Sequence, residues 1–341
     1  MKIILSGGGT GGHIIPNISL LKKLESHQIL YIGSVKGMES KLIPEHGVKF
    51  EGIQCGKLRR YFSLENFVDF FRTIIGIWQS FWKVKKFNPK VVFCKGGYVS
   101  LPVAIGAWIA RKPVIIHESD LVPGLANRIA AKFASVICVS FKESKKYLRS
   151  DKIIVTGNPV RAELADGKRD KGLKFAGLDG KKPVILVMGG SQGAGFINEL
   201  IAKDFDELVK NFEIIHLCGQ GKVNKNLNSK NYFVAEFVKN EMKDLYAAAD
   251  LIVTRAGANS LAEIEFLGKP AILIPLIKGS RGDQVGNAEA FANENQVEII
   301  KENVFKGSII EIAEKLIKSK GKPKKSDAAE IITNLILNYD Q

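Results

Sequence analysis

The sequence predicts an α/β protein with two domains, each built on a parallel sheet. Short apolar and β-branched runs alternate with helical patterns along almost the whole chain, and such alternation produces parallel sheets with right-handed crossovers. The arrangement of strand, glycine loop and helix opens both halves, at Gly7–Gly12 and at Gly189–Gly195. A length of 341 residues corresponds to two domains at ~150 residues per domain. We therefore expect two Rossmann-like domains that face one cleft.

The strands are expected in two series, one for each domain. The first series comprises Ile3–Ser6, Ile29–Gly33, Val91–Cys94, Val114–His117, Val136–Val139 and Ile153–Thr156. The second series comprises Val184–Met188, Ile214–Cys218, Tyr232–Glu236, Leu251–Thr254, Ala271–Pro275 and Val297–Ile300. Helical patterns lie between most of these strands, for example at Pro16–Ser26, Asn198–Lys210, Ser260–Leu267 and Asn287–Asn295.

Two charged, glycine-containing segments mark the expected boundaries between domains. Gly157–Pro183 reads as a linker that leads into the second domain, and the basic run Lys318–Lys325 precedes a last amphipathic helix. We therefore expect an N-terminal domain over residues 1–159 and a C-terminal domain over residues 160–321. The helix within 322–341 is expected to pack back on the first domain.

The composition excludes several classes of protein. With 45% hydrophobic and 25% charged residues, the chain is neither collagen-like nor disordered. Its longest apolar stretch, Leu101–Ala110, is shorter than the ~20 residues of a membrane span, and the N-terminus has no signal-peptide core. The four cysteines lie far apart with no CxxC pair, which favours reduced thiols in a cytoplasm over a zinc ribbon or a disulfide scaffold.

The positive charge is concentrated in the first half of the chain. Residues 1–160 contain 24 Lys and Arg against 10 Asp and Glu, a net charge of +14, out of +15 for the whole chain. A one-sided basic field indicates an anionic partner: a nucleic acid, an acidic membrane surface or a phosphorylated substrate. The alternative is a charge that serves only solubility, but such a charge has no reason to segregate in one half.

The first glycine loop, Gly7–Gly12, is suited to anions but is not a specific motif. Glycines let a backbone approach a ligand closely, and a helix N-terminus favours negative charge. A dinucleotide site also needs an acid at the end of the second strand, and this strand ends at Ser34 without one. No P-loop, lipase-type or zinc-protease motif is present, and the five histidines show no metal-ligand spacing.

Three further glycine-containing loops follow strands of the second half, where ligands bind in open α/β sheets. They are Gly189–Ala194, Arg255–Ser260 and Gly279–Gln284. The middle loop leads into a helix that carries Glu263 in its first turn, where it could accept hydrogen bonds from a ribose or simply complement the helix dipole. Together the loops predict a site for a nucleoside diphosphate.

Several motifs, in order and spread over most of the chain, resemble the MurG family of peptidoglycan N-acetylglucosaminyltransferases. The matching motifs are Gly7–His13 with Pro16, Gly96–Ser100, His117-Glu118, Gly157–Arg161, Gly189–Ala194, and Gln284 with Asn287. The resemblance implies a two-domain GT-B fold, with an N-terminal acceptor and membrane-associating domain over residues 1–159 and a C-terminal nucleotide-sugar donor domain over residues 160–321. It also implies an inverting transfer, without metal or cofactor, of N-acetylglucosamine from UDP-N-acetylglucosamine to undecaprenyl-diphosphate-linked muramoyl pentapeptide in peptidoglycan synthesis.

By position in the family motifs, the resemblance places donor contacts on residues in both halves. They are Thr10, Gly11, Gly12, Asp120, Arg161, Ser191, Val238, Ala258, Asn259, Ser260, Glu263 and Gln284. One departure concerns the pair after His117-Glu118, where many members carry Gln-Asn and this chain has Ser119-Asp120. An aspartate could still bind a sugar hydroxyl, so the role of Asp120 stays open.

The catalytic base is expected to be His13, with Glu118 and Asp120 as rivals. His13 lies at the mouth of the first glycine loop, where a helix N-terminus lowers the pKa of an imidazole and keeps it neutral. His13 could instead only hydrogen-bond the loop or the acceptor diphosphate. Stabilisation of the leaving diphosphate would fall to loop N–H groups and to Arg161, whose alternative role is that of a cation at the domain junction. Tyr98 is expected to shape the acceptor pocket.

The segment Ser63–Phe87 predicts a helix with an aromatic surface. Its apolar residues include Trp78, Phe81 and Trp82, and cations flank it on both sides. Such a helix suits the anionic cytoplasmic leaflet of a membrane, and hence a peripheral protein, although a buried helix that covers the sheet is the alternative.

Three other functions are alternatives to this one. A nicotinamide oxidoreductase lacks its strand-two acid, and no helix-turn-helix, RNA-binding signature or aromatic ladder supports a nucleic-acid partner. The nearest competitor is a glycosyltransferase of the same fold with a different acceptor.

Overall fold

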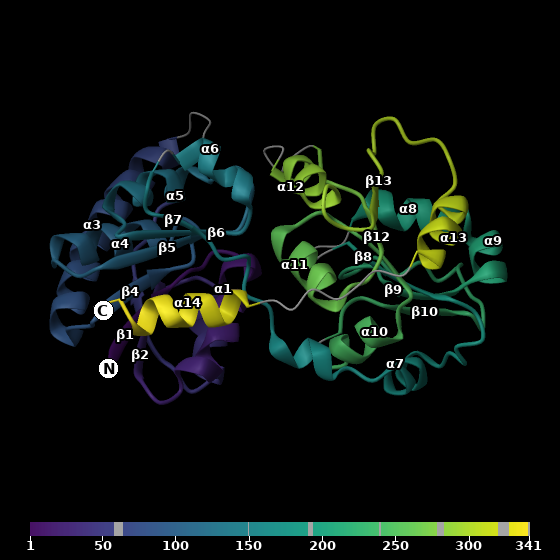
Figure 1. The fold of residues 1–341 in the computed structure, drawn as a ribbon, viewed down its shortest axis with the longest axis horizontal. Coiled ribbons are helices and arrows are strands. Elements are labelled where there is room, and N and C mark those ends of the chain that lie inside the picture. Colours follow the sequence, from purple (N-terminus) through teal and green to yellow (C-terminus); the bar gives the residue numbers. More distant parts are fainter. Residues whose placement is uncertain are drawn as a thin grey trace. The chain divides into compact units, whose positions relative to one another are not determined.

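The computed structural model describes residues 1–57, 64–148, 150–189, 194–238, 240–277, 283–319 and 327–339. The chain divides into two compact units (Figure 1). The first unit is formed by Met1–Val160 together with Ser326–Gln341, and the second by Arg161–Lys325. Each unit contains one parallel sheet.

The first unit is built on a seven-stranded sheet with the order β3-β2-β1-β4-β5-β6-β7. The strands are β1 Lys2–Ser6, β2 Gln28–Ser34, β3 Lys49–Ile53, β4 Val91–Cys94, β5 Val114–Glu118, β6 Val136–Val139 and β7 Ile153–Val155. The helices are α1 Gly11–Leu21, α2 Glu39–Glu45, α3 Leu64–Phe87, α4 Ser100–Ile109, α5 Leu125–Ala130, α6 Lys145–Leu148 and α14 Ala328–Leu337. The strand order reverses between β1 and β4, and ligands of open α/β sheets bind at such a point.

Alternate residues of the first sheet belong to two separate cores. Ile4 of β1 packs in the core that α3, α4 and α5 cover, whereas its neighbours Ile3 and Leu5 pack against α1, α2 and α14. This follows from the two-residue repeat of a strand whose two faces are both buried. Ile332 and Ile336 of α14 lie in the second of these cores, so the C-terminal helix is part of the first unit.

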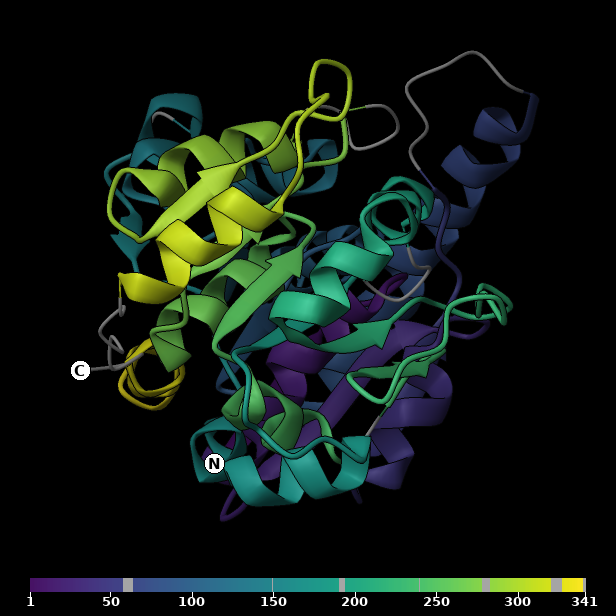
Figure 2. The same ribbon diagram turned by 90° about the vertical axis from the view of Figure 1, so that its right-hand side faces the viewer.

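The second unit is built on a six-stranded sheet with the order β10-β9-β8-β11-β12-β13. The strands are β8 Val184–Met188, β9 Glu213–Leu217, β10 Tyr232–Ala235, β11 Leu251–Thr254, β12 Ala271–Leu273 and β13 Val297–Ile299. The helices are α7 Arg169–Ala176, α8 Gly195–Lys203, α9 Phe205–Asn211, α10 Met242–Ala248, α11 Ala258–Leu267, α12 Asp283–Ala292 and α13 Ile310–Lys318. Figure 2 shows helices on both sides of this sheet, whose order reverses between β8 and β11.

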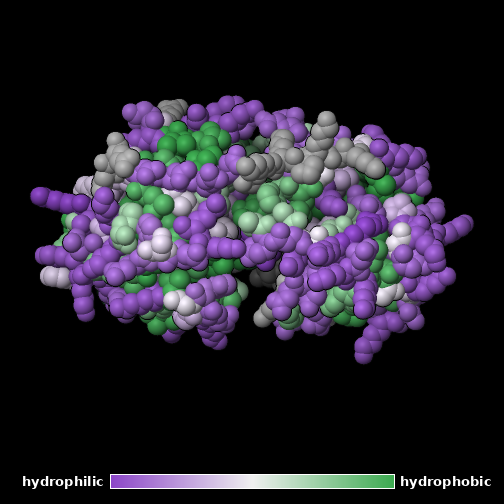
Figure 3. Space-filling model, turned by 60° about the horizontal axis from the view of Figure 1, so that its bottom comes forward, coloured by the Kyte–Doolittle hydropathy of each residue, from purple (hydrophilic) through white to green (hydrophobic). Residues whose placement is uncertain are grey.

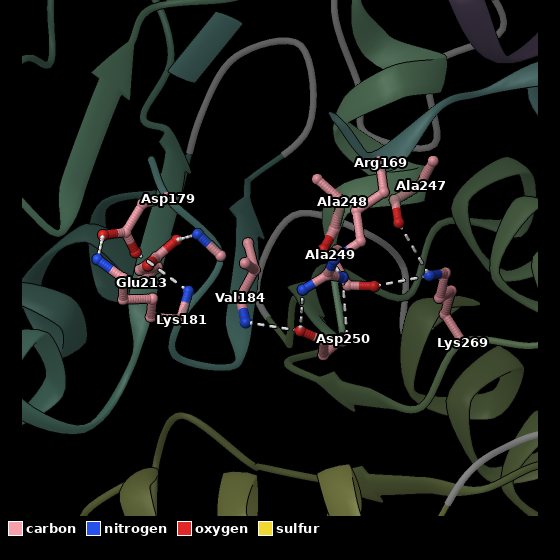
Figure 4. A network of polar contacts seen from close by, with 11 residues as sticks. Arg169, Asp179, Lys181, Val184, Glu213, Ala247, Ala248, Ala249, Asp250 and Lys269 are labelled. Atoms are coloured by element: carbon pink, nitrogen blue, oxygen red, sulfur yellow. Dashed lines mark hydrogen bonds and ion pairs between the residues drawn. The ribbon is translucent and has the colours of Figure 1, made fainter. Parts of the chain in front are cut away.

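A polar network fixes the amino-terminal ends of β8 and β11 (Figure 4). The Arg169 guanidinium donates two hydrogen bonds of 3.0 Å to the Asp250 carboxylate, which also accepts a 2.8 Å bond from the N–H of Val184. Lys269 donates to the carbonyl of Ala249 at 2.6 Å. Because these residues lie at the ends opposite to the glycine loops, the network stabilises the sheet away from the candidate site.

Several expectations on secondary structure are wrong in detail. The linker expected over Gly157–Pro183 contains α7, which packs against α10 through Gly172 and ends at Gly177 in the left-handed conformation (φ 67°). The first helix begins at Gly11 rather than Pro16, because the glycine loop itself forms its first turn. The helix expected over Asn198–Lys210 is interrupted at Asp204 and forms α8 and α9.

One strand, β3, was not expected. It contains Glu51 and Gly52, which interrupt the apolar pattern, and lies at the edge of its sheet. Glu51 accepts a 2.9 Å bond from Lys83 of α3, so a helix cation compensates the edge-strand acid and lowers the pKa of its carboxyl, although partial burial acts in the opposite direction.

Candidate functional site

The first glycine loop is held in place by side chains of its own unit. The hydroxyl of Tyr31 donates a 2.6 Å bond to the carbonyl of Gly7 and accepts one of 2.9 Å from Asn17. The buried Glu39 carboxylate accepts bonds from the N–H of Gly9 at 3.2 Å and from the N–H of Ser34 at 2.9 Å. Three side chains from α1, β2 and α2 thus fix the loop that follows β1.

The space beside this loop is filled. A Cβ added at Gly8 would overlap the Glu39 carboxylate, and one at Gly7 would lie 2.8 Å from the side-chain nitrogen of Asn17. The Glu39 carboxylate thus fills the space at the carboxyl end of β2 and accepts hydrogen bonds from the main chain. Glu39 was not singled out from the sequence. The signal for it was an acidic residue that follows a buried strand and the glycines Gly33 and Gly37, at the start of a helical pattern.

His13 lies in the first turn of α1, directly after this loop. Its Nδ1 shares a 3.0 Å hydrogen bond with the hydroxyl of Thr10, the residue that precedes the helix. Although His13 keeps some exposed surface, the packed loops around the ring desolvate it. This burial, together with the charge of Lys95, lowers the pKa of His13 to about 4. The imidazole is therefore neutral at neutral pH, as a general base must be.

Glu118 at the end of β5 has its carboxylate engaged by three hydrogen bonds. It accepts bonds from the N–H groups of Asp120 and Gly124, both at 3.0 Å, and from the side chain of Asn127 at 2.9 Å. Burial, and next the charge of Asp120, raises the pKa of Glu118 to about 7. These bonds give Glu118 a role in holding the loop after β5; its role as a base stays a prediction.

A fully buried lysine, which the sequence analysis missed, lies beside the departure from the family motif. Lys95 follows β4, and its Nζ donates to the hydroxyl of Ser119. Burial lowers the pKa of Lys95 to about 8, while the charges of Glu118 and Asp120 oppose this shift. The signal that could have found it is a single cation between the apolar strand β4 and Gly96. Lys95 thus supplies a positive charge close to Glu118 and Asp120.

Tyr98, the expected acceptor residue, contacts the first glycine loop directly. Its ring lies where a Cβ of Gly9 would be, and Gly9 has a positive φ of 83°. Tyr98 also lines a cavity of about 460 Å³. The first unit therefore brings together Thr10, His13 and Tyr98 around one loop, with Lys95, Glu118 and Asp120 at the neighbouring strand ends.

The carboxyl edge of the second sheet has an open helix N-terminus. α11 begins at Ala258 after Gly257, and its first turn contains Asn259 and Ser260. A Cβ placed at Gly257, or at Gly195 where α8 begins, meets no atom of the described residues within 4 Å. The N–H groups of a helix N-terminus bind phosphate, so this arrangement leaves room for a diphosphate.

Glu263 of α11 forms a buried group with Arg161 and Tyr246. Tyr246 donates a 2.8 Å bond to one carboxylate oxygen, and the Arg161 guanidinium lies 3.6 Å from the other. Burial raises the pKa of Glu263, and the charge of Arg161 opposes the rise. The Nε of Arg161 is buried without a hydrogen-bond partner among the described residues. The group thus combines a carboxylate acceptor with the positive charge of a guanidinium.

The positions of the remaining predicted residues say less about the chemistry of the site. Gln284 lies in the first turn of α12, where its side-chain oxygen accepts a 3.0 Å bond from the N–H of Leu276. Val238 is half-buried in the loop after β10, and Gly11 and Gly12 open α1. Ser191 lies outside the described residues.

The described part of the chain has neither a cluster of metal ligands nor a membrane-spanning helix. Among those residues, no group of three or more His, Cys, Asp or Glu side chains could hold a metal ion. None of the described helices combines the length and the apolar content that crossing a bilayer requires.

Two family models match the chain, one in each unit. Residues 3–139 match the glycosyltransferase family 28 N-terminal domain, and residues 184–336 match the glycosyltransferase family 28 C-terminal domain. A Bacillus cereus protein named UDP-N-acetylglucosamine–N-acetylmuramyl-(pentapeptide) pyrophosphoryl-undecaprenol N-acetylglucosamine transferase 2 is 43% identical, over 100% of this chain and 99% of its own length. A Clostridium tetani transferase of the same name without the number is 42% identical, over 99% and 98%.

The solved structures agree on the fold. MurG of Acinetobacter baumannii is 23% identical, with a TM-score of 0.74 over 98% of this chain and 99% of that one. UDP-GlcNAc 2-epimerase of Neisseria meningitidis is 19% identical, with a TM-score of 0.68 over 99% and 100%. The resemblance found in the sequence motifs is confirmed. The chain therefore belongs to glycosyltransferase family 28 and, within it, to the MurG group of N-acetylglucosamine transferases with the GT-B fold.

Proposed function

We propose that this protein transfers N-acetylglucosamine from UDP-N-acetylglucosamine to undecaprenyl-diphosphate-linked N-acetylmuramoyl-pentapeptide, converting lipid I to lipid II in peptidoglycan synthesis. The names of relatives at 42–43% identity over their full length support this activity. The observation that carries the mechanism is the neutral, desolvated His13 beside a rigid glycine loop, in the unit that we assign to the acceptor.

In this mechanism the acceptor hydroxyl attacks the anomeric carbon of the donor sugar and the bond from that carbon to the diphosphate breaks. With Nδ1 of His13 held by Thr10, Nε2 takes the proton of the attacking hydroxyl. His13 needs no prior deprotonation, because its pKa of about 4 leaves it neutral at neutral pH. Attack from the side opposite to the leaving group inverts the configuration of the anomeric carbon.

The second unit would stabilise the departing UDP. Backbone N–H groups at the start of α11 are oriented before the reaction, so they stabilise the developing negative charge without reorganising. Arg161 would add a positive charge, and the Glu263 carboxylate would accept hydrogen bonds from the ribose hydroxyls. The first turn of α12, with Gln284, and the loop that contains Ser191 are the further donor contacts that we propose.

The direct test is to measure UDP release from UDP-N-acetylglucosamine with and without a short-chain lipid-diphosphate muramoyl pentapeptide. We expect UDP release only when the acceptor is present, and we expect this release to need no added metal. Donor binding without release would contradict the proposed acceptor, and neither binding nor release would contradict the proposed function.

We also propose that the first unit binds the cytoplasmic leaflet of the membrane as a peripheral protein. Apolar side chains reach the surface of the molecule (Figure 3). On α3 and α4 they include Phe67, Phe70, Phe71, Ile74, Ile75, Trp78, Trp82, Trp108 and Ile109. Trp82 is 60% exposed and Lys85 lies 5.4 Å from the centre of its ring, so cations accompany the aromatic surface. This combination suits an anionic bilayer surface.

Sedimentation with anionic liposomes tests the membrane proposal. Replacing both Trp78 and Trp82 by Ser is expected to reduce the bound fraction strongly, because both side chains are more than half exposed. Phe81, a third aromatic expected in this surface, is only half-exposed and is the less informative target. Unchanged binding of the double variant would contradict the proposal, and binding to random duplex DNA in its place would favour a nucleic-acid partner.

A further inference from the structure

The first unit contains a cavity that the proposed transfer step does not use. Its volume is about 460 Å³, within the range of roughly 300–1,000 Å³ for small-molecule sites. It lies at the carboxyl ends of β2 and β3, beside the first part of α3. Its lining consists of Ser34, Val35, Lys36, Ile53, Gln54, Cys55, Lys57, Asp69, Arg72 and Tyr98.

Tyr98 connects this cavity to the glycine loop that precedes His13. One side of the ring contacts Gly9, and the same residue lines the cavity. Gly97, directly before Tyr98, lies next to the His13 ring: a Cβ at Gly97 would be 3.2 Å from Nδ1. Tyr98 therefore contacts both the cavity and the loop that precedes the proposed base.

The lining carries an excess of positive charge. Lys36 and Lys57 are exposed and have no ion-pair partner within the described part of the chain. Arg72 of α3 is paired with the buried Asp69 at 3.1 Å, so these two charges largely compensate each other. Val35, Ile53 and the Tyr98 ring add apolar surface. The cavity thus combines two free cations, one ion pair and apolar walls.

We propose that this cavity binds the peptide stem of the acceptor, with Lys36 and Lys57 on the stem's carboxylates. This rests on the proposed function. In a muramoyl sugar the peptide is attached through the lactoyl ether on the carbon next to the one that bears the reacting hydroxyl, so the peptide must leave from beside the reacting centre. A peptide presents carboxylates, amides and small apolar side chains, which match the mixed lining. A diphosphate would leave the apolar walls unused and would approach the Asp69 carboxylate.

The test compares two acceptors that share sugar, diphosphate and short lipid. One carries the full pentapeptide and the other only the lactoyl group with the first residue. Replacing both Lys36 and Lys57 by Gln is expected to raise KM for the pentapeptide acceptor roughly tenfold, the loss of about one charge-assisted contact. KM for UDP-N-acetylglucosamine and for the truncated acceptor is expected to change less than twofold. Lys41→Gln, on the exposed surface of α2, is the matched control.

Two further measurements distinguish the possible causes of a change in KM. Conversion of the stem carboxylates to amides is expected to raise KM for the native protein and to abolish the difference between the native protein and the double variant. Val35→Phe, at a side chain that is 58% exposed, narrows the cavity without disturbing the core and is expected to weaken only the pentapeptide acceptor.

The outcomes distinguish this inference from the proposed function. Equal KM increases for both acceptors would overturn the inference, because the cations would then bind the diphosphate or the sugar. Unchanged KM for both would overturn it as well. Acceptor-dependent UDP release by the native protein in either case would leave the transferase function standing, whereas no release with either acceptor would overturn that function first.

Discussion

The carboxyl edges of the two sheets share a sequence pattern but differ in how tightly they are packed. After β1, a Cβ at Gly7 or Gly8 would lie within 3 Å of side chains of the same unit. At the starts of α8 and α11, a Cβ at Gly195 or Gly257 would meet no atom of the described residues within 4 Å. Among those residues, the first loop is thus packed by the protein itself, and the two helix starts of the second edge are left open. Glycine is needed at Gly7 and Gly8 for close packing inside the protein, and we propose that at the second edge it allows the approach of a ligand.

The two edges also differ in electrostatics. The first contains His13, Lys95 and Glu118, whose pKa values are shifted to about 4, 8 and 7 mainly by burial. Clusters of shifted groups are typical of acid–base chemistry. The second contains the ion pairs of Glu263 with Arg161 and of Arg255 with Glu302 beside helix N-termini, which is an arrangement for binding an anion and a sugar. We infer that the first edge carries out proton transfer and the second holds the nucleotide.

The largest expected effect tests proton transfer at the first edge. His13→Ala is expected to lower kcat by about 10²–10⁴-fold, the usual contribution of a general base, and to leave Kd for UDP within about twofold. The measurement is acceptor-dependent UDP release with titration of UDP alongside. If His13→Ala retained near-normal turnover with an unchanged pH profile, His13 would not be the base, and Asp120 would be the next candidate.

The close packing of the first loop predicts a large loss of stability. Gly8→Ala places a methyl group on the Glu39 carboxylate and is expected to cost about 1–3 kcal/mol of unfolding free energy, as overpacking usually does. Chemical denaturation followed by circular dichroism measures this cost. Because Glu39→Ala removes the carboxylate, Gly8→Ala is expected to cost less in that background than in the native protein. An equal cost in both backgrounds would contradict the proposed contact.

The pH profile tests the role of Lys95. The base form of His13 is the active one, so activity falls as pH falls through its pKa, which is about 4. Lys95→Met removes the second cause of that low pKa, a cationic neighbour, while the larger cause, burial, remains. The acid limb of kcat/KM is therefore expected to move upward, to between pH 4 and the ordinary histidine value of 6.5. A limb that stayed in place, or moved down, would mean that Lys95 does not act on His13.

The smallest expected effect concerns the open second edge. The methyl group of Gly195→Ala meets no atom of the described residues within 4 Å and lies at the start of a helix, so the change is expected to stabilise the protein by about 0.4–1 kcal/mol. The same methyl group would enter the space that we assign to the donor diphosphate and raise KM for UDP-N-acetylglucosamine. Loss of stability, or an unchanged donor KM, would show that the two edges are not as different as proposed.

Much of the fold could be predicted from the sequence because it depends on local patterns. The apolar runs gave β4, β6, β8 and β11 with their observed bounds, and α3 begins within one residue of its expected start. β3 was missed because the polar pattern of Glu51 and Gly52 is compensated only in three dimensions, by Lys83 from α3. The break between α8 and α9 falls at Asp204, where the apolar spacing continues and gives no signal.

The parts of the site that lie in sequence motifs could be predicted from the sequence, whereas the parts that arise from tertiary packing could not. The glycine loops, His13 and Glu263 lie in motifs that the sequence displays. Glu39 and Lys95 come from segments that become neighbours of the loops only after folding, and each is buried against groups distant in sequence. The pairing of Glu263 with Tyr246, on a separate helix, is likewise a result of tertiary structure.

The most direct test of the division of labour is calorimetric titration of UDP, which lacks the donor sugar, into two variants. Glu263→Gln is expected to weaken UDP binding by about tenfold, the loss of roughly one charge-assisted hydrogen bond. His13→Gln is expected to leave Kd for UDP within about twofold of the native protein while abolishing most turnover. If His13→Gln weakened UDP binding and Glu263→Gln did not, the assignment of the nucleotide to the second edge would be contradicted.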